Sequence, residues 1–534
     1  MTDGTDRVQA LRPRPTRPIQ VDAVLFDLDG VVTRTAQVHA AAWKRAFDEW
    51  FDLRARADGV ERQRFDQDRD YRLFVDGRPR HDGVRGFLRS RGIDLPHGTE
   101  ADDADQDTVC GIAARKNRYF RDWLAHHRVE SLPGTLALLG ELRQAGVKAG
   151  VFSASRNARA VLASAGVTER FDVVVDGHDA VDRGLAGKPD PAVLLEAAAR
   201  LGVSPDRTAV VEDAVAGIVA GVRGGFGLVI GVDRSGGNGG LREAGADIVV
   251  ADSSEVTLMP NEGLAVKTLD ALPLVWSRQD EIRQRLSARS VALFVDYDGT
   301  LTPIVEDFTK AFLATDMRAA LEEASRRCTV AVVSGRDIHL LRSLVRLESV
   351  YYAGSHGFEI ARPAGWTGRV EKGVECLPAL DRAERALAGR LTDIPGHAVE
   401  RKRFSIAVHY RRVPDDAVPR VEAAVDAVVA EFTELRKGRG KKVFEIQPDI
   451  EWDKGQAVLW LLDRLGLDRP DVVPVYIGDD VTDEDAFRVI VGRGVAVGVR
   501  DGQTRQTSAA YAVANTEDVR AFLAWLATIA GGLA

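Results

Sequence analysis

The stretch Val291-Ala-Leu-Phe-Val-Asp-Tyr-Asp-Gly-Thr-Leu301 places two aspartates two residues apart at the end of a short apolar run. Nearly the same pattern occurs earlier in the chain, as Asp22-Ala-Val-Leu-Phe-Asp-Leu-Asp-Gly-Val-Val32. A short apolar run of this kind is consistent with a strand buried in a sheet. The repetition indicates either a common strand end without chemistry or two active sites of one type.

Short β-branched runs alternate with longer helical patterns around both stretches. This alternation indicates βαβ units and a parallel sheet. The predicted strands are 23–26, 147–152, 173–175, 209–211 and 228–232 in the first half, and 291–295, 329–333, 349–353, 472–477 and 494–499 in the second. A chain of 534 residues is too long for one core. The fold class is therefore α/β, with two tandem Rossmann-like domains.

Each half contains a block that interrupts this alternation. Residues from about 36 to 130 are helix-like and charged, and residues from about 374 to 448 mix amphipathic helix with strands at 404–410 and 443–446. We interpret them as inserted caps, one helical and one α+β. The predicted organisation is a disordered tail (1–18), a first domain (19–252), a linker (253–285) and a second domain (286–534).

Composition excludes several functional classes. A net charge of −8 and a pI near 5.8 argue against nucleic acid or an anionic membrane as the main partner. Three widely spaced cysteines have no metal-ligand spacing and predict reduced thiols. No apolar run approaches the roughly 20 residues that span a bilayer, and the polar N-terminus lacks a secretory signal. We expect a cytoplasmic protein, and its oligomeric state is left open.

The position of each aspartate pair suggests its chemistry. Ligands of open α/β sheets bind beyond the carboxyl ends of the strands, where Asp27 and Asp296 are predicted to lie. Two such carboxylates repel each other, and Mg²⁺, which prefers oxygen ligands and substrate phosphate, is the usual remedy. One carboxylate is then free to act as a nucleophile that forms an aspartyl-phosphate, and the other as a general acid/base.

Companion residues follow both pairs in the same order. Each pair is followed by a serine, a lysine and late acidic residues, which are Ser153, Lys188 and Glu212-Asp213 in the first half and Ser334, Lys454, Asp479-Asp480 and Asp483 in the second. Serine and lysine supply a hydroxyl donor and a positive charge for phosphoryl oxygens, and the late acids complete a metal site. The sequence therefore predicts two aspartyl-phosphate sites.

In both halves the sequence resembles the haloacid dehalogenase superfamily of phosphotransferases, from Val21 to the C-terminus. The second half resembles trehalose-6-phosphate phosphatases in the stretches Asp296-Tyr-Asp-Gly-Thr-Leu-Thr-Pro-Ile304, Val333-Ser-Gly-Arg336, Ala353-Gly-Ser-His-Gly-Phe-Glu359, Ser405-Ile-Ala-Val-His-Tyr-Arg411, Phe444-Glu-Ile-Gln-Pro448, Glu451-Trp-Asp-Lys-Gly455 and Gly478-Asp-Asp-Val-Thr-Asp-Glu484.

This resemblance implies a role for each matched residue. Asp296 is implied as the nucleophile and Asp298 as the acid/base. The implied Mg²⁺ ligands are Asp296, the Asp298 carbonyl and Asp479, with Asp483 in support. The implied phosphate ligands are Ser334, Arg336 and Lys454, and the implied disaccharide ligands of the cap are Glu400, Lys402 and Glu445. His356 is as consistent with a substrate or hinge residue as with a hydrogen-bonded core histidine.

The first half resembles β-phosphoglucomutases. The matching stretches are Phe26-Asp-Leu-Asp-Gly-Val-Val-Thr33, Thr35-Ala-Gln-Val-His-Ala-Ala-Ala-Trp43, Arg115-Lys-Asn117, Ser153-Ala-Ser-Arg-Asn157 and Gly187-Lys-Pro-Asp-Pro191. The resemblance implies Asp27 as nucleophile, Asp29 as acid/base, and Asp27, Asp29 and Asp213 as metal ligands, with Glu212 nearby. It places His39, Lys116, Ser153 and Lys188 near substrate or phosphate. Arg34 departs from the family, which commonly has an acid there, and the phosphate-binding arginine of the cap is Arg78 or Arg80.

The expected activity is Mg²⁺-dependent hydrolysis of trehalose 6-phosphate through an aspartyl-phosphate, with a second, sugar-phosphate mutase activity in the first half. The partners expected are small-molecule sugar phosphates. Two alternatives remain open. In one alternative, the second half is a phosphatase of another sugar phosphate. In the other, the first half is a non-catalytic scaffold or a sugar-phosphate sensor.

Overall fold

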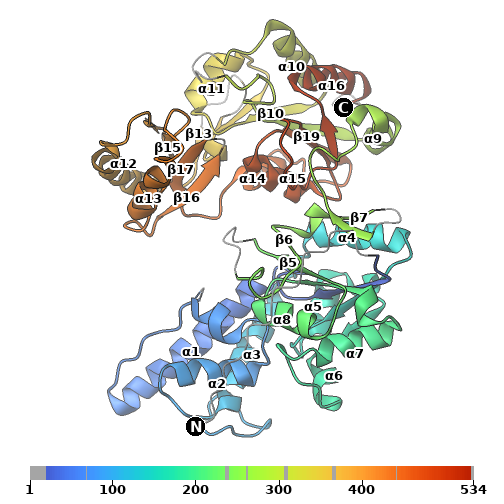
Figure 1. Ribbon diagram of the computed structural model, residues 1–534, viewed down its shortest axis with the longest axis vertical. Coiled ribbons are helices and arrows are strands. Elements are labelled where there is room, and N and C mark those ends of the chain that lie inside the picture. The colour runs from blue at the N-terminus through green and yellow to red at the C-terminus, as the bar shows by residue number, and fades with distance from the viewer. Residues whose placement is uncertain are drawn as a thin grey trace. The chain divides into compact units, whose positions relative to one another are not determined.

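The computed structural model describes residues 20–67, 69–234, 240–259, 263–305, 311–361, 363, 369–440 and 442–530. The predicted tail, 1–18, lies outside the described residues. The chain divides into two compact units, 1–266 and 267–534. Each unit is built on its own largely parallel sheet with a cap beside it (Figure 1). Among the described residues, no helix combines the length and apolar content that a bilayer crossing requires.

The sheet of the first unit has the order β3-β2-β1-β4-β5-β6 and is parallel throughout. Its strands are β1 (Ala23–Asp27), β2 (Lys148–Phe152), β3 (Val173–Val175), β4 (Thr208–Glu212), β5 (Leu228–Val232) and β6 (Ile248–Val250). The five predicted strands are all present, and β6 is an additional edge strand. The central strand β1 carries the first aspartate pair at its carboxyl end.

Helices cover both faces of this sheet because successive side chains of a strand point to opposite sides. Val24 and Phe26 pack with α4 (Pro133–Gln144) and α5 (Ala158–Ala165). Ala23 and Leu25 pack with α7 (Ala192–Leu201) and α8 (Val215–Arg223). Both faces of β1 are therefore dry, and Asp27 is the polar residue at which the strand ends.

The first cap is helical, as predicted. It contains α1 (Ala36–Asp58), the π-helix η1 (Tyr71–Val75), α2 (Arg80–Ser90) and α3 (Val109–His126). Its own core is aromatic, with Trp43, Phe47, Trp50, Phe65 and Phe87 among the buried residues. Because this core is separate from that of the sheet, the cap packs as a distinct subdomain of the unit.

The segment predicted as a linker, 253–285, contains regular structure. The hairpin of β7 (Val256–Met259) and β8 (Gly263–Val266) belongs to the first unit. The short helix η5 (Val275–Arg278) and α9 (Gln279–Leu286) belong to the second. Ile282 and Leu286 of α9 are fully buried, so its sparse apolar residues form one packed face. The division between the units falls at Val266 and Lys267.

The sheet of the second unit has the order β13-β12-β11-β10-β9-β18-β19-β20. Its strands are β9 (Ser290–Val295), β10 (Thr329–Val333), β11 (Tyr351–Gly354), β12 (Glu359–Ala361), β13 (Arg369–Glu371), β18 (Val472–Gly478), β19 (Val495–Val499) and β20 (Tyr511–Val513). Strands β11, β12 and β13 pair antiparallel, and the other neighbours pair parallel. Strand β12 and the edge strands β13 and β20 were not predicted.

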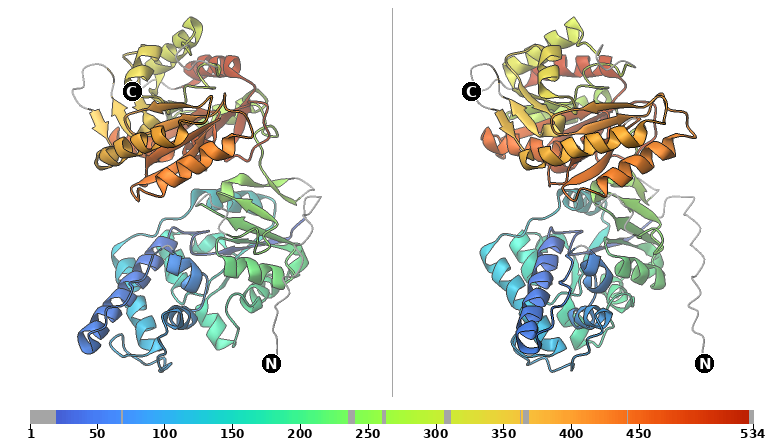
Figure 2. Two further views of the ribbon diagram at one scale, coloured as in Figure 1. Left: turned by 60° about the vertical axis from the view of Figure 1, so that its left-hand side comes forward. Right: turned by 90° about the vertical axis from the view of Figure 1, so that its left-hand side faces the viewer.

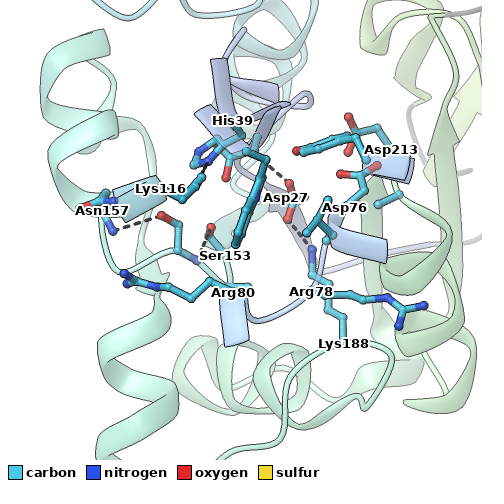
Figure 3. Close-up of a pocket in the computed structure, with 18 of the residues that line it drawn as sticks. Asp27, His39, Asp76, Arg78, Arg80, Lys116, Ser153, Asn157, Lys188 and Asp213 are labelled. Carbon is cyan, nitrogen blue, oxygen red and sulfur yellow. Dashed lines mark hydrogen bonds and ion pairs between the residues drawn. The ribbon is translucent and has the colours of Figure 1, made fainter. Parts of the chain in front are cut away.

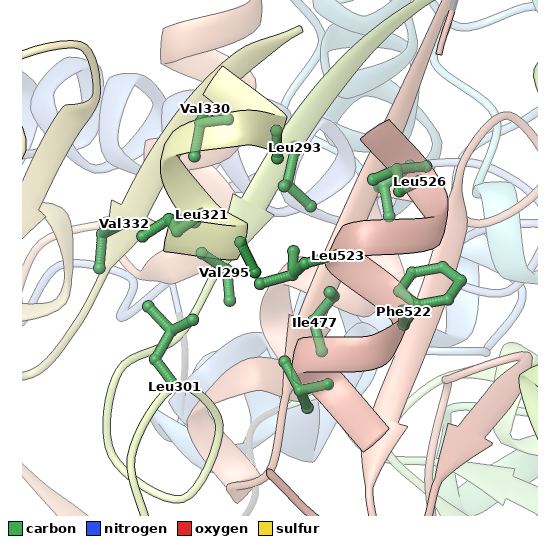
Figure 4. Packing of buried hydrophobic residues seen from close by; sticks show 14 of the residues in the cluster. Leu293, Val295, Leu301, Leu321, Val330, Val332, Ile477, Phe522, Leu523 and Leu526 are labelled. Atoms are coloured by element: carbon green, nitrogen blue, oxygen red, sulfur yellow. The ribbon is translucent and has the colours of Figure 1, made fainter. Parts of the chain in front are cut away.

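Helices α10 (Thr315–Arg327) and α16 (Thr516–Ile529) cover one face of this sheet, where Leu293 and Val295 pack against Leu321 and Leu523 (Figure 4). Helices α14 (Lys454–Arg464) and α15 (Glu484–Ile490) cover the other face, where Phe294 packs. The helix α11 (Ile338–Val345) follows β10. As in the first unit, an aspartate follows a strand that is dry on both sides.

The second cap combines a sheet with two helices, as predicted. The antiparallel strands run in the order β14-β15-β17-β16, and they are β14 (Ala398–Arg401), β15 (Ile406–His409), β16 (Leu435–Gly440) and β17 (Val443–Pro448). The helices α12 (Leu377–Leu391) and α13 (Val418–Val429) lie side by side on one face of this sheet (Figure 2). The other face is free to present the polar residues of β14, β15 and β17 to the pocket.

Candidate active sites

Each unit has a pocket at the carboxyl ends of its central strands. One pocket is lined by Asp27, Asp29, His39, Lys116, Ser153, Lys188, Glu212 and Asp213, among others. The other is lined by Asp296, Asp298, Ser334, Arg336, Glu400, Lys402, Glu445, Lys454 and Asp479, among others. The structure thus brings together, in two separate sites, all the site residues that the sequence predicted. The parallel strands do this because their carboxyl ends meet at one edge of the sheet.

The glycine after each aspartate pair allows the third acid to approach. Gly30 and Gly299 have φ of +93° and +81°. A Cβ on Gly30 would lie 1.8 Å from Asp213 Oδ2, and one on Gly299 would lie 2.0 Å from Asp479 Oδ2. Any side chain at these positions would displace the acid, so the glycines are required by the close approach as well as by the turn.

A buried lysine bridges two carboxylates in each site. Lys188 Nζ lies 2.5 Å from Asp27 Oδ1 and 2.7 Å from Glu212 Oε2. In the second unit, Lys454 Nζ lies 3.1 Å from Asp296 Oδ1 and 2.7 Å from Asp483 Oδ1. Burial would lower the pKa of each lysine, but the flanking carboxylates raise it, so both lysines are charged. Glu212 and Asp483 therefore anchor the lysine that faces the nucleophile position.

Asp483 is held rigidly in this anchoring role. It is fully buried and accepts hydrogen bonds from the Tyr476 hydroxyl at 2.7 Å and from the Asp480 backbone N–H at 2.9 Å. Together with Lys454 these donors occupy both of its oxygens. Asp483 is thus engaged with protein groups.

The carboxylates of each site, including the one that anchors the lysine, cluster closely enough to hold a magnesium ion. Ligand atoms of Asp27, Glu212 and Asp213 lie within 4.8 Å of one another, and so do those of Asp296, Asp479 and Asp483. Burial and the neighbouring carboxylates raise the pKa of Asp27 well above its ordinary value. Burial also raises the pKa of Asp296, which Lys454 only partly offsets. A divalent cation would relieve this repulsion, and an all-oxygen donor set suits Mg²⁺.

The second aspartate of each pair has different partners in the two units. In the first unit, Asp29 accepts a hydrogen bond from the Thr35 hydroxyl at 2.5 Å and lies 3.2 Å from His39 Nε2. His39 Nδ1 lies 2.5 Å from Nζ of Lys116, which comes from cap helix α3 (Figure 3). A chain of polar groups therefore joins the cap to Asp29.

The pKa values of Asp29 and Lys116 in this series of polar groups reflect both burial and the neighbouring charges. Burial would raise the pKa of Asp29, but His39 and Thr35 lower it to about 2. Burial lowers the pKa of Lys116 to about 7 against the attraction of Asp29, and Arg80 adds to the decrease. A lysine with such a pKa can lose or gain a proton near neutral pH, as required of a group that assists proton transfer.

In the second unit, Asp298 is paired with an arginine. Arg336 donates from Nε to Asp298 Oδ2 at 2.6 Å and from its Nη2 to Oδ1 at 2.5 Å. Such a two-bond pair is among the stronger arrangements of these groups. Arg336, which the sequence assigned to phosphate binding, is thus paired with Asp298, the residue implied as the acid/base.

The first cap touches the core directly over its site. A Cβ on Gly77 would lie 3.1 Å from the Ala214 Cβ, and a Cβ on Gly187 would lie 2.2 Å from the Pro79 Cγ. Both glycines thus permit close contact between cap and core. Asp76, which the sequence analysis did not single out, also lines the pocket and is close enough to raise the pKa of Asp213 (Figure 3). It follows a π-helix, an element frequent at functional sites.

The arginines of interest in the first unit differ in surroundings. Arg78 is exposed, whereas Arg80 is half-buried and extends toward the side of the pocket that holds Asn157 and Lys116 (Figure 3). The Arg80 guanidinium has no ion-pair or hydrogen-bond partner within the part of the chain that is described. Arg34 is exposed, lies 3.7 Å from Glu130 and does not line the pocket.

The second cap contributes a polar wall to its pocket. Lys402 Nζ lies 3.0 Å from Glu445 Oε1, and His409 Nε2 lies 3.0 Å from Glu400 Oε2. Arg411 lines the same wall. The sequence analysis singled out neither His409 nor Arg411 as a site residue. His409 could have been indicated by the pairing of β15 with β14, which carries the predicted Glu400, whereas Arg411 lies beyond the end of β15.

Sequence comparison assigns the two units to related families. A family model of trehalose-phosphatase matches residues 294–517, and a model of haloacid dehalogenase-like hydrolases matches residues 21–225. Both superfamily assignments from the sequence are confirmed, and so is the likeness of the second half to trehalose phosphatases.

The chain is similar to the following individual proteins. The chain is 38% identical over 412 residues to the trehalose-phosphate phosphatase of Mycobacterium leprae (strain TN), covering 74% of this chain and 92% of that protein. It is 39% identical over 511 residues to an uncharacterised glycosyl hydrolase of Mycobacterium tuberculosis (strain ATCC 25618 / H37Rv), covering 95% of this chain. The chain spans only 38% of the length of that relative. A solved β-phosphoglucomutase of Clostridium difficile is 26% identical, covers 44% of this chain and 92% of its own, and has a TM-score of 0.34.

Proposed function

Since the chain belongs to the trehalose-phosphatase family, we propose that its C-terminal unit hydrolyses trehalose 6-phosphate to trehalose and phosphate. The observation that carries the proposal is the arrangement of Asp296 between a buried lysine and the Asp479 carboxylate, in a pocket that is also lined by polar residues of the cap. The reaction class is phosphoryl transfer to an aspartate and then to water.

In the first step the Asp296 carboxylate attacks phosphorus and the sugar oxygen departs. Lys454 holds Asp296 from one side and offers positive charge to the phosphoryl oxygens, while the Ser334 hydroxyl is placed to donate to them. Mg²⁺ would be held by Asp296, Asp479 and the Asp298 carbonyl, and when bound it neutralises charge that develops on the phosphoryl group.

Asp298 is proposed to protonate the leaving sugar oxygen and then to remove a proton from the attacking water. Arg336 occupies both Asp298 oxygens in the substrate-free site. A substrate phosphate competes for the guanidinium, because arginine binds phosphate through the same paired donors. Phosphate binding would thereby release Asp298 to take up and deliver a proton, which couples acid/base catalysis to the presence of substrate.

Removing divalent cations is expected to abolish trehalose 6-phosphate hydrolysis. Without a cation, the buried carboxylates around Asp296 repel both one another and the phosphate. Treatment with EDTA followed by a phosphate-release assay should show no activity, and added Mg²⁺ should restore it. Asp479→Asn is the matched control and should raise the Mg²⁺ concentration needed for recovery. Full activity in exhaustively chelated enzyme would show that no metal is needed.

For the N-terminal unit we propose phosphoryl transfer between positions of a sugar phosphate, with Asp27 as the nucleophile and Asp29 as the acid/base. The supporting observation is the polar chain Lys116–His39–Asp29, which ties the state of the cap to the acid/base. Of the two candidate cap arginines, Arg80 is proposed to bind a phosphate, because it is half-buried beside Lys116 and has a guanidinium available to a ligand. A cap closed over the site excludes water from the aspartyl-phosphate.

Phosphorus NMR on the full-length chain carrying Asp296→Asn tests this second activity. With Mg²⁺ and a bisphosphate primer, β-glucose 1-phosphate and glucose 6-phosphate should interconvert, and free phosphate should grow only slowly. Faster growth of free phosphate would make the unit a phosphatase. A complete lack of turnover would favour the alternative of a scaffold or a sugar-phosphate sensor. A phosphate-release screen over sugar phosphates with the Asp27→Asn chain tests the alternative substrate of the C-terminal unit.

A further inference from the structure

We propose that His356 is a positioning residue in the C-terminal site. It joins the loop 334–336, which is expected to bind phosphate and is called the phosphate-binding loop below, to Glu445 of the cap. This link sets the preference for phosphate carried on a large sugar. The inference rests on the proposed function of that site. Of the two interpretations of His356 that the sequence left open, the contact with Glu445 favours a role at the junction of core and cap.

The backbone at His356 has a conformation that demands support. Ser355 and His356 have φ of +49° and +57°, and Gly357 follows with +89°. Left-handed backbone is uncommon for residues other than glycine, and two such residues in succession persist only where surrounding contacts fix them. Strained conformations of this kind cluster at functional sites.

The supporting contacts come from the phosphate-binding loop. The Ser355 backbone N–H donates to the Arg336 carbonyl at 2.7 Å, and the His356 N–H donates to the Ser334 carbonyl at 2.9 Å. The glycine between those two residues is also explained, because a Cβ on Gly335 would lie 2.8 Å from Cε1 and Nε2 of the His356 ring. The imidazole therefore lies directly against the loop that is expected to hold phosphate.

The other side of the imidazole contacts the cap. His356 Nε2 lies 2.8 Å from Glu445 Oε2, and both side chains are close to buried, with exposed fractions of 12% and 10%. Glu445 also accepts from Lys402 at 3.0 Å and from the Gln447 amide at 2.8 Å. Burial would raise the pKa of Glu445, but Lys402 and His356 lower it well below its usual value, so the carboxylate is charged. A charged hydrogen bond thus spans from core to cap at the pocket wall.

The contact between His356 and Glu445 affects which phosphate esters the site prefers. When the histidine is replaced, Glu445 still accepts hydrogen bonds from Lys402 and Gln447, so its charge stays compensated. Its attachment to the core, however, is lost. The distance between the polar wall of the cap, which is expected to bind the sugar, and the phosphate-binding loop is then no longer fixed. A substrate that must reach both is penalised, whereas a small phosphate ester that occupies only the core is not.

Kinetics on two substrates test the inference, with trehalose 6-phosphate as the large ester and p-nitrophenyl phosphate as the small one. All variants carry Asp27→Asn so that only the C-terminal site reports. Asparagine tolerates left-handed backbone but cannot reach Glu445. His356→Asn should therefore lower kcat/KM for trehalose 6-phosphate by about 10- to 100-fold, mainly through KM, as expected for a lost hydrogen bond to a charge. The turnover of p-nitrophenyl phosphate should change by less than about threefold, within the usual effect of a substitution away from the chemistry.

Three further variants keep the test decisive. His356→Gln retains a donor and should recover part of the loss, and Gly335→Ala should reproduce the loss by pushing the ring aside. His339→Asn, the same change at an exposed residue outside the pocket, should have no effect. An equal loss on both substrates, or no loss on either, would overturn the inference. If the unchanged chain hydrolyses p-nitrophenyl phosphate but not trehalose 6-phosphate, the proposed substrate fails, and the same comparison with the preferred sugar phosphate still tests His356.

Discussion

Replacing Asp296 by asparagine is expected to abolish hydrolysis of trehalose 6-phosphate. The amide is not a competent nucleophile, and the loss should reach roughly 10⁴-fold or more, as for other enzymes that lose their nucleophile. The fold should be retained, because asparagine has the same shape and can still contact Lys454, which lies 3.1 Å from the carboxylate. A phosphate-release assay on the full-length chain measures the effect.

Asp27→Asn is the matched control for this prediction, since it makes the same change at the same place in the other unit. It should leave trehalose 6-phosphate hydrolysis unchanged. Near-normal turnover in Asp296→Asn together with complete loss in Asp27→Asn would show that trehalose 6-phosphate is hydrolysed in the N-terminal unit and that the assignment is wrong.

The second large effect is expected for Asp298→Asn. Loss of a general acid/base typically costs roughly 10²–10⁴-fold, and asparagine would also lose one of the two bonds with Arg336. The two half-reactions should suffer unequally. A substrate with a good leaving group, such as p-nitrophenyl phosphate, needs no protonation to depart, but water still needs a base to attack the aspartyl-phosphate.

In an Asp27→Asn background, this variant should therefore show a burst of about one nitrophenolate per site, followed by slow turnover, as expected when an intermediate accumulates. Rapid-quench measurement of nitrophenolate resolves the burst. A steady rate from the first turnover, close to that of the unchanged enzyme, would contradict the role given to Asp298.

The central strands were predictable because they are dry on both faces. Strands β5 and β10 begin and end at the predicted residues, and nearly all of their residues are buried. The edge strand β3 also matches its prediction, although only Val175 of its three residues is buried, because its run of three valines stands between Asp172 and Asp176. Strand β12, the edge strand β13 and the helix α9 were not predicted. The two strands have three residues each, too few for a period, and α9 buries only Ile282 and Leu286.

Which residues line the two candidate sites could be predicted from the sequence, but not how their side chains pair. Sequence order places Asp296 and Asp479 at strand ends, and the topology brings them together with Lys454 at the start of α14. Which carboxylate the lysine anchors to, and whether Arg336 faces phosphate or Asp298, depends on side-chain directions that no spacing encodes. Asp76 of the first cap and His356 of the second core are similar cases, because their contacts join segments far apart in the sequence.

The most direct test of the account is to locate the phosphorylated aspartate during turnover. The unchanged chain is mixed with trehalose 6-phosphate and Mg²⁺, quenched rapidly, and treated with borohydride, which reduces an acyl phosphate to the alcohol and so converts the phosphorylated aspartate to homoserine. Peptide mass mapping then identifies the residue. The account predicts homoserine at position 296 and unchanged Asp27 with this substrate. Homoserine at position 27 with Asp296 intact would contradict it.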